Sequence, residues 1–131
     1  MPTIHWGAVA LATLVTFAIG GLWYSPLLFA KVWQREAGLT DAQLKSANTQ
    51  LIFGGALVLN FLATLVFAMF LGPHPGLAFG TGAGFAAGLF WVAGSFGVNY
   101  LFERRSLGLW LINGGYNVVM FTAIGAILGA F

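Results

Sequence analysis

The stretch Ile4–Tyr24, IHWGAVALATLVTFAIGGLWY, contains no Asp, Glu, Lys or Arg and is long enough to cross a bilayer as one helix. The hydrocarbon core requires about 20 predominantly apolar residues in helical form. Three further stretches meet the same criterion, at about residues 47–71, 77–101 and 107–130. The sequence therefore predicts an all-α bundle of four transmembrane helices, with residues 1–131 as a single membrane domain.

The composition of the whole chain agrees with a membrane location. Of its 131 residues, 60% are hydrophobic and 6% are charged, and the mean hydropathy is +0.91. A soluble domain of this size could not bury so much apolar surface. The net charge of +2 arises without a dense basic run, so nucleic acid is not an expected partner. Because the chain has no cysteine, disulfides, thiol catalysis and thiolate metal sites are excluded.

A short amphipathic helix is expected between the first two spans. Ser25 before Pro26 suits the start of a new helix, with Ser25 as the N-cap. Residues 26–37 mix apolar and charged side chains, which is typical of a helix lying flat at the membrane interface. Gly38 is expected to end this helix, because glycine favours the left-handed conformation found there.

The second span is expected to begin well before the hydrocarbon core. The segment Thr40-Asp41-Ala42-Gln43 has the pattern of a capping box, in which the first and fourth side chains bond each other's backbone. From Asp41 to Leu71 no residue interrupts the helical pattern. One continuous helix is therefore predicted, with its first two turns protruding from the membrane.

The basic residues set the expected orientation. All of them lie between spans one and two or between spans three and four: Lys31, Arg35, Lys45, Arg104 and Arg105. By the positive-inside rule these connections face the cytoplasm and both termini lie outside it. The N-terminal stretch lacks a basic region and a small-residue cleavage site, so we expect the first span to be retained.

Residues 23–33 carry a recognisable motif: Trp23-Tyr24-Ser25-Pro26-Leu27-Leu28-Phe29-Ala30-Lys31-Val32-Trp33. The segment resembles the signature of a bacterial family of small integral membrane proteins catalogued as domain of unknown function 1761. Ala30 stands where that family usually has glycine. The similarity extends over the whole chain in length, number of spans and the asparagine-rich last helix. The resemblance implies a membrane location, which we expect to be the bacterial inner (plasma) membrane, and it carries over no activity.

Polar side chains inside the spans are the candidates for a site. The spans contain no Asp, Glu, Lys or Arg, which argues against proton exchange through an embedded carboxylate, as in small four-span multidrug exporters. The candidates are Asn60, Asn99, Asn113 and Asn117, with Thr16, Ser95 and Tyr116 as lesser members and Trp91 as a core or pocket wall. Three roles remain open: hydrogen bonds between helices, a polar cavity for a neutral or weakly polar ligand, or a docking site for another subunit.

Glycines recur at helical spacing in the last two spans: Gly80, Gly84, Gly88, Gly125 and Gly129. Such faces allow close helix contact, either within the bundle or between copies. His5 and His74 are too few for a metal site without carboxylate or thiolate neighbours, and Ser25 has no residue to activate it. No metal, cofactor or enzymatic activity is expected.

Three functions remain under consideration. The leading one is a non-catalytic bundle that forms homo-oligomers or serves as a subunit of a membrane complex. The alternatives are a channel or carrier for a small neutral solute, and a lipid-binding protein. In the last case, headgroups would be bound by basic side chains: Lys31, Arg35, Arg104 and Arg105.

Overall fold

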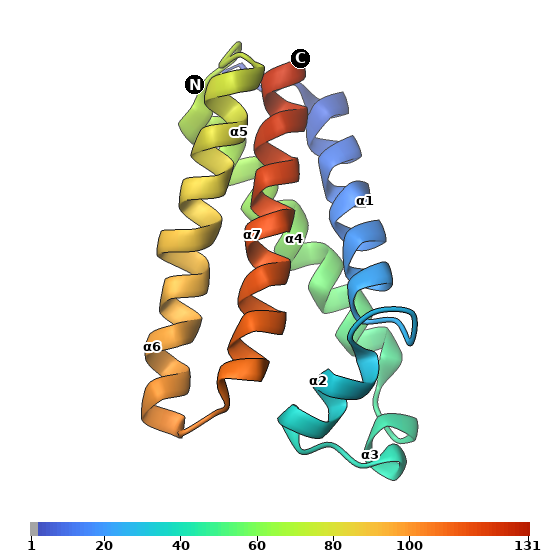
Figure 1. Ribbon diagram of the computed structural model, residues 1–131. Coiled ribbons are helices and arrows are strands. Elements are labelled where there is room, and N and C mark those ends of the chain that lie inside the picture. The colour runs from blue at the N-terminus through green and yellow to red at the C-terminus, as the bar shows by residue number, and fades with distance from the viewer. Residues whose placement is uncertain (1–2) are drawn as a thin grey trace.

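The computed structural model describes residues 3–131, which form helices joined by short connections (Figure 1). Four segments are long and apolar enough to cross a membrane: α1 (Trp6–Trp23), α4 (Thr49–Leu71), the third span Leu77–Glu103, and α7 (Leu107–Ala130). The third span comprises α5 (Leu77–Ala86), the π-helical η1 (Ala87–Ala93) and α6 (Gly94–Glu103). Two short helices, α2 (Ala30–Ala37) and α3 (Asp41–Lys45), connect the first two spans. The predicted all-α fold with four spans is confirmed.

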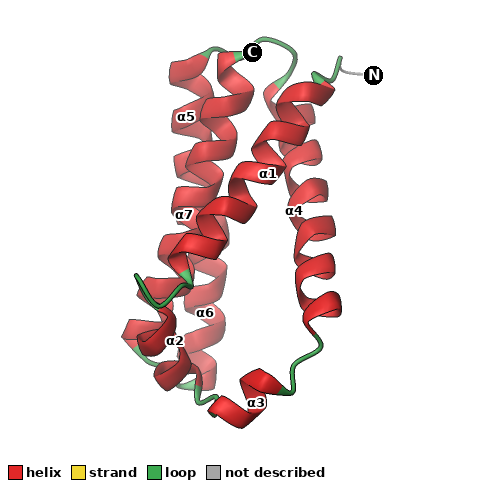
Figure 2. Cartoon of the chain, turned by 90° about the vertical axis from the view of Figure 1, so that its right-hand side faces the viewer, coloured by secondary structure: helices red, strands yellow, loops and turns green. Residues whose placement is uncertain are grey.

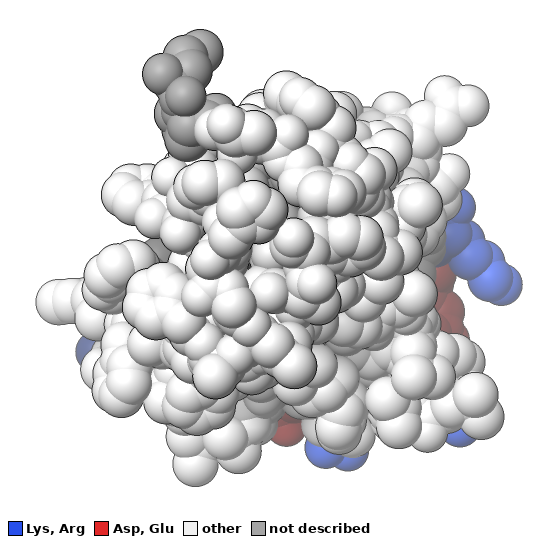
Figure 3. Space-filling model, turned by 90° about the horizontal axis from the view of Figure 1, so that it is seen from above, with Lys and Arg blue, Asp and Glu red and all other residues white. Residues whose placement is uncertain are grey.

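The two ends of the bundle differ in charge. The start of α1 and the end of α7 lie at the same end, here called the termini end (Figure 1). Seen from this side in Figure 3, the surface is uncharged, and charged side chains appear at its margins. The charged residues belong to α2, α3 and the region between α6 and α7: Lys31, Arg35, Glu36, Asp41, Lys45, Glu103, Arg104 and Arg105. The end of the bundle that carries these residues is called the charged end below.

Helix α7 is the centre of the bundle. It contacts α1, α2, α5, η1 and α6, whereas α4 packs mainly against α1. A small core near the termini end joins α1, α4 and α7 through buried residues: Ala8, Val9, Ala12, Ala68, Met120, Ile124 and Leu128. Figure 2 shows α1 and α4 diverging from this end toward α3. Only Thr64 and Ala68 of α4 are buried, so α4 is the least covered span.

The α5–η1 part of the third span and α7 approach each other through their glycines. A Cβ atom added at any of the five predicted glycines would collide with backbone atoms of the opposite helix: Gly80, Gly84, Gly88, Gly125 and Gly129. At Gly88, for example, that atom would lie 2.9 Å from the carbonyl oxygen of Asn117. These glycines, called the glycine seam below, therefore pack within one chain and do not face a second copy.

The expectation of one continuous helix from Asp41 to Leu71 is wrong. The capping box is present, since Thr40 Oγ1 accepts from the Gln43 N–H at 3.1 Å and Gln43 Oε1 from the Thr40 N–H at 2.8 Å. It opens only α3, which ends at Lys45 with Ser46 as its C-cap. Asn48 then caps a new helix, accepting from the Leu51 N–H at 3.1 Å. A polar side chain that bonds to nearby backbone thus competes successfully with helix continuation.

The predicted interfacial helix begins later than expected. The helix is Ala30–Ala37, and residues 25–29 form turns instead. Ser25 does not act as an N-cap, because its hydroxyl donates to the Leu22 carbonyl at the end of α1, at 2.6 Å. The expected end is confirmed, since Gly38 has φ +74° and its N–H donates to Arg35 and Gln34 carbonyls.

Candidate functional site

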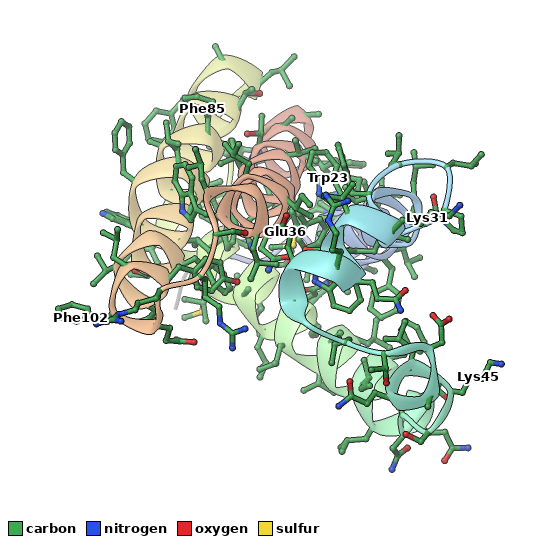
Figure 4. All side chains as sticks on the ribbon, turned by 60° about the horizontal axis from the view of Figure 1, so that its bottom comes forward. Trp23, Lys31, Glu36, Lys45, Phe85 and Phe102 are labelled. Carbon is green, nitrogen blue, oxygen red and sulfur yellow. The ribbon has the colours of Figure 1, made fainter. Side chains whose placement is uncertain are left out.

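The Trp-Tyr pair of the motif binds α1 to the central helix. Trp23 Nε1 donates to the backbone carbonyl of Ile112 at 2.9 Å, and the Tyr24 hydroxyl donates to Asn113 Oδ1 at 2.6 Å. The indole fits because Gly115 has no side chain; a Cβ atom there would lie 3.1 Å from Trp23 Cζ2. Two adjacent residues of the motif therefore bind two adjacent residues of α7, and Trp23 points toward α7 in Figure 4.

Asn113 joins three parts of the bundle. Besides accepting from Tyr24, its Nδ2 donates to the Tyr100 hydroxyl of α6 at 2.8 Å. The Tyr24 ring also packs edge-on against Trp33 of α2 and Tyr116 of α7, with centroids 5.8 and 5.5 Å apart. This Asn113 junction, formed by Tyr24, Asn113 and Tyr100, ties the end of α1 and the end of the third span to α7.

A second group of polar side chains attaches α4 to α1. Asn60 Nδ2 donates to Thr16 Oγ1 at 3.1 Å, and the Tyr116 hydroxyl donates to the Thr16 carbonyl at 3.4 Å. The Thr16 hydroxyl is fully buried and donates to the Thr13 carbonyl at 2.6 Å. Asn60, Thr16 and Tyr116 form what is called the Thr16 junction below. Asn60 links the middle of α4 to it.

The remaining candidates do not join these junctions through their side chains. Asn117 Nδ2 donates to the backbone carbonyl of Asn113 on the same helix, at 2.8 Å. Asn99 is exposed on α6, and Ser95 donates to the Trp91 carbonyl at 2.5 Å. Trp91 is not a core residue, because it is 76% exposed on η1. The structure therefore separates Asn60 from Asn113 and leaves Asn99 and Trp91 at the surface.

The grooves on the described surface are mostly apolar. One of about 560 Å³ lies between α4 and the α5–η1 region and includes Phe70, Phe90 and Trp91. Another of about 810 Å³ lies between α1 and α4 and includes Trp6 and Phe61. Within residues 3–131, every buried side-chain nitrogen or oxygen has a hydrogen-bond partner. The amides of Asn60, Asn113 and Asn117 are engaged within the protein.

Trp110 forms a further contact that the sequence did not reveal. Its Nε1 donates to the backbone carbonyl of Ala93 at 2.8 Å, at the point where η1 ends. A Cβ atom at Gly97 would lie 3.0 Å from Trp110 Nε1, and one at Gly114 would lie 3.5 Å from it. Sequence analysis can find such a residue by looking for glycines opposite a tryptophan, but the opposing helix must be known first.

The charged and imidazole groups have local roles. Arg35 and Glu36 approach to 3.7 Å, and Arg105 Nε lies 3.3 Å from Glu103 Oε1. His5 Nδ1 caps α1 by accepting from the Ala8 N–H at 3.0 Å. Among the described residues, no group of three or more potential metal ligands occurs. Lys31 is exposed on α2, and Arg104 has a left-handed backbone, with φ 59°.

Comparison with known proteins yields one relationship. No curated protein and no solved structure matches the chain. A family model described as "Protein of unknown function (DUF1761)" matches residues 7–129, from the first turn of α1 to the last turn of α7. The match includes the Trp23-Tyr24 pair and both polar junctions. The chain therefore belongs to the DUF1761 family.

Proposed function

We propose that this protein is a non-catalytic membrane bundle that associates through α4 with a second copy of itself. The observation that carries the proposal is the exposure of one half of α4. Between Thr49 and Leu59 none of its residues is buried, although the same helix is well packed at Thr64 and Ala68. The half of α4 nearer the charged end thus has little contact with its own bundle.

Two adjacent glycines favour a helix over lipid as the partner of this surface. Gly54 and Gly55 lie inside α4, and a Cβ atom at either position would meet nothing within 4 Å. A glycine in a helix interior lowers the stability of the helix by about 1 kcal/mol relative to alanine. The packing of the chain itself requires glycine at neither position. Leu51 and Val58 flank the pair on the same face and are 70% and 57% exposed. Small residues between large apolar ones are typical of helix association in membranes.

A solute carrier has less support. The amides of Asn60 and Asn113 are bound to Thr16, Tyr24 and Tyr100. These bonds occupy part of the hydrogen-bonding capacity of the two amides, so fewer donors and acceptors are left for a solute. The grooves beside α4 are lined by apolar side chains and suit lipid chains better than a polar solute.

Native mass spectrometry of the gently extracted protein tests the proposal. We expect a complex of twice the chain mass of 13.9 kDa. The double variant Gly54→Leu with Gly55→Leu should shift the equilibrium toward monomer about tenfold, for a loss of about 1.4 kcal/mol. Gly82→Leu is the control, because Gly82 is an exposed glycine of α5 with open space around it.

The outcomes are distinct. A wild-type monomer, or equal effects of the α4 and Gly82 variants, would contradict self-association through α4. A stoichiometric foreign subunit released by the α4 variant would instead identify an accessory component of a larger complex.

We further propose that the charged end faces the cytoplasm of a bacterial inner membrane. All five Lys and Arg residues lie at this end, which supports the orientation by the positive-inside rule. Because the chain has no cysteine, single introduced cysteines can report the orientation. A membrane-impermeant maleimide should label His74→Cys in intact cells, and Lys45→Cys only after permeabilisation. The reverse pattern would refute the orientation.

A further inference from the structure

An open, mostly apolar cavity, with a few polar side chains among its lining residues, lies at the charged end between α6 and α7. Its volume is about 320 Å³, and its lining includes Gly97, Tyr100, Leu101, Arg105, Leu107 and Trp110. This volume is at the lower end of the range for small-molecule sites. Phe102 marks the neighbouring end of α6 in Figure 4. The cavity lies outside both polar junctions, although Tyr100 belongs to one of them.

The Trp110 contact helps to define this cavity. The indole is held against the third span by its bond to the Ala93 carbonyl at the end of η1, and Gly97 of α6 provides the necessary space. The ring therefore forms a fixed wall between the two helices. Tryptophan is suited to the level of the lipid headgroups, where one part of the ring contacts apolar groups and another is polar.

Arg105 gives the cavity a preference for anions. Its guanidinium approaches Glu103 through Nε at 3.3 Å, and its side chain is 44% exposed. A guanidinium has five N–H donors, so one carboxylate contact leaves capacity for a phosphate group. Arg104 adds a second positive charge beside it in the sequence, while Glu103 opposes anion binding. Among the basic residues of the chain, Arg105 is the one that lines this cavity.

The apolar rim indicates an amphiphile. Leu101 and Leu107 line the cavity and are 81% and 70% exposed, so they can contact hydrocarbon chains. Tyr100 accepts a hydrogen bond from Asn113, which leaves its own hydroxyl proton for another acceptor. A water-soluble anion would gain nothing from the leucines. We propose that this cavity binds the phosphate headgroup of an anionic phospholipid, whose acyl chains lie along Leu101 and Leu107.

The test compares lipid binding to the full-length protein in detergent by native mass spectrometry. The probes are phosphatidylglycerol and phosphatidylcholine with identical acyl chains, and the readout is the ratio of the two bound lipids. We expect the wild type to prefer phosphatidylglycerol. Arg105→Gln should lower the ratio about fivefold, the usual effect of one basic residue near a charged headgroup.

Three further variants separate the cavity from general charge. Lys45→Gln removes the same charge from α3, on the opposite side of the molecule from Phe102 in Figure 4, and should leave the ratio unchanged. Arg105→Lys should retain most of the preference. Glu103→Gln should increase it, because the competing carboxylate is lost.

Three results would overturn the inference. The first is equal binding of both lipids to the wild type, and the second is an equal loss in the Lys45 and Arg105 variants. The third is displacement of phosphatidylglycerol by inorganic phosphate alone, which would indicate a site for the free anion. Retention of the lipid in the presence of phosphate supports the phospholipid.

Discussion

Replacing Gly84 with valine is expected to prevent formation of the stable bundle. Gly84 lies at the middle of the glycine seam, where a Cβ atom would collide with the Phe121 carbonyl group and approach the Thr122 Cα within 3.1 Å. Overpacking costs about 1–3 kcal/mol where neighbouring side chains can move. Here the obstacle is backbone, so α5 and α7 would have to separate along their length. We therefore expect a loss of about 3 kcal/mol or more.

The experiment has a control two residues away. Gly82 lies on the opposite side of α5, is exposed, and has nothing within 4 Å of an added Cβ atom. Gly82→Val should therefore melt close to the wild type in detergent, while Gly84→Val should melt far below it or fail to accumulate. Thermal unfolding followed by circular dichroism measures both. Similar melting of the two variants would mean that α5 and α7 do not pack through the seam.

Replacing Asn113 with leucine is expected to produce the second largest loss. The substitution removes the acceptor of the Tyr24 hydroxyl and the donor to the Tyr100 hydroxyl. Hydrogen bonds between helices in membranes contribute about 0.6–1.7 kcal/mol each. Because both bonds are lost at a half-buried position, the free energy of unfolding should fall by about 1–3 kcal/mol. Asn99→Leu, an exposed substitution on α6, should change it little.

A double-mutant cycle assigns part of this loss to one bond. Tyr24→Phe removes the hydroxyl that donates to Asn113 and retains the ring contacts with Trp33 and Tyr116. If the bond contributes as the geometry indicates, Tyr24→Phe should cost much less in the Asn113→Leu background than in the wild type. Additive losses would mean that the two side chains act independently.

The spans could be predicted from the sequence because length and hydropathy are local properties. Each span needs about 20 apolar residues, and the lack of charge within them left little choice of boundaries. The capping box at Thr40 and the helix end at Gly38 were predicted correctly because they also depend on residues close together in the sequence. The break at Ser46 was missed, although Asn48 is a good N-cap, because protruding polar turns are compatible with a continuous helix.

The pairing of helices could not be predicted from the sequence. The spacing of Gly80 and Gly84 indicates a flat face but not its partner, which is the face of Gly125 on α7. Likewise, Asn60 and Asn113 were grouped because both are polar side chains inside predicted spans. A position within a span does not determine which face of the helix an amide occupies, and the structure assigns the two residues to different junctions.

The role of the Trp-Tyr motif also depends on three-dimensional contacts. The sequence alone identified Trp23 and Tyr24 only as part of the motif in residues 23–33. The structure shows that both donate to α7, with Gly115 leaving room for the indole. The match over residues 7–129 covers both partners of this contact. The contact holds the end of α1 against the central helix.

Disulfide cross-linking in native membranes tests self-association through α4 most directly. The chain has no cysteine, so Gly54→Cys places a single thiol on the proposed contact face. In a twofold dimer with both copies in the same orientation, the two thiols would face each other. Leu111→Cys is the control, since Leu111 is 56% exposed and lies in the second turn of α7, near the charged end. We predict efficient cross-linking at residue 54 and little at 111, and equal cross-linking at both positions would contradict the account.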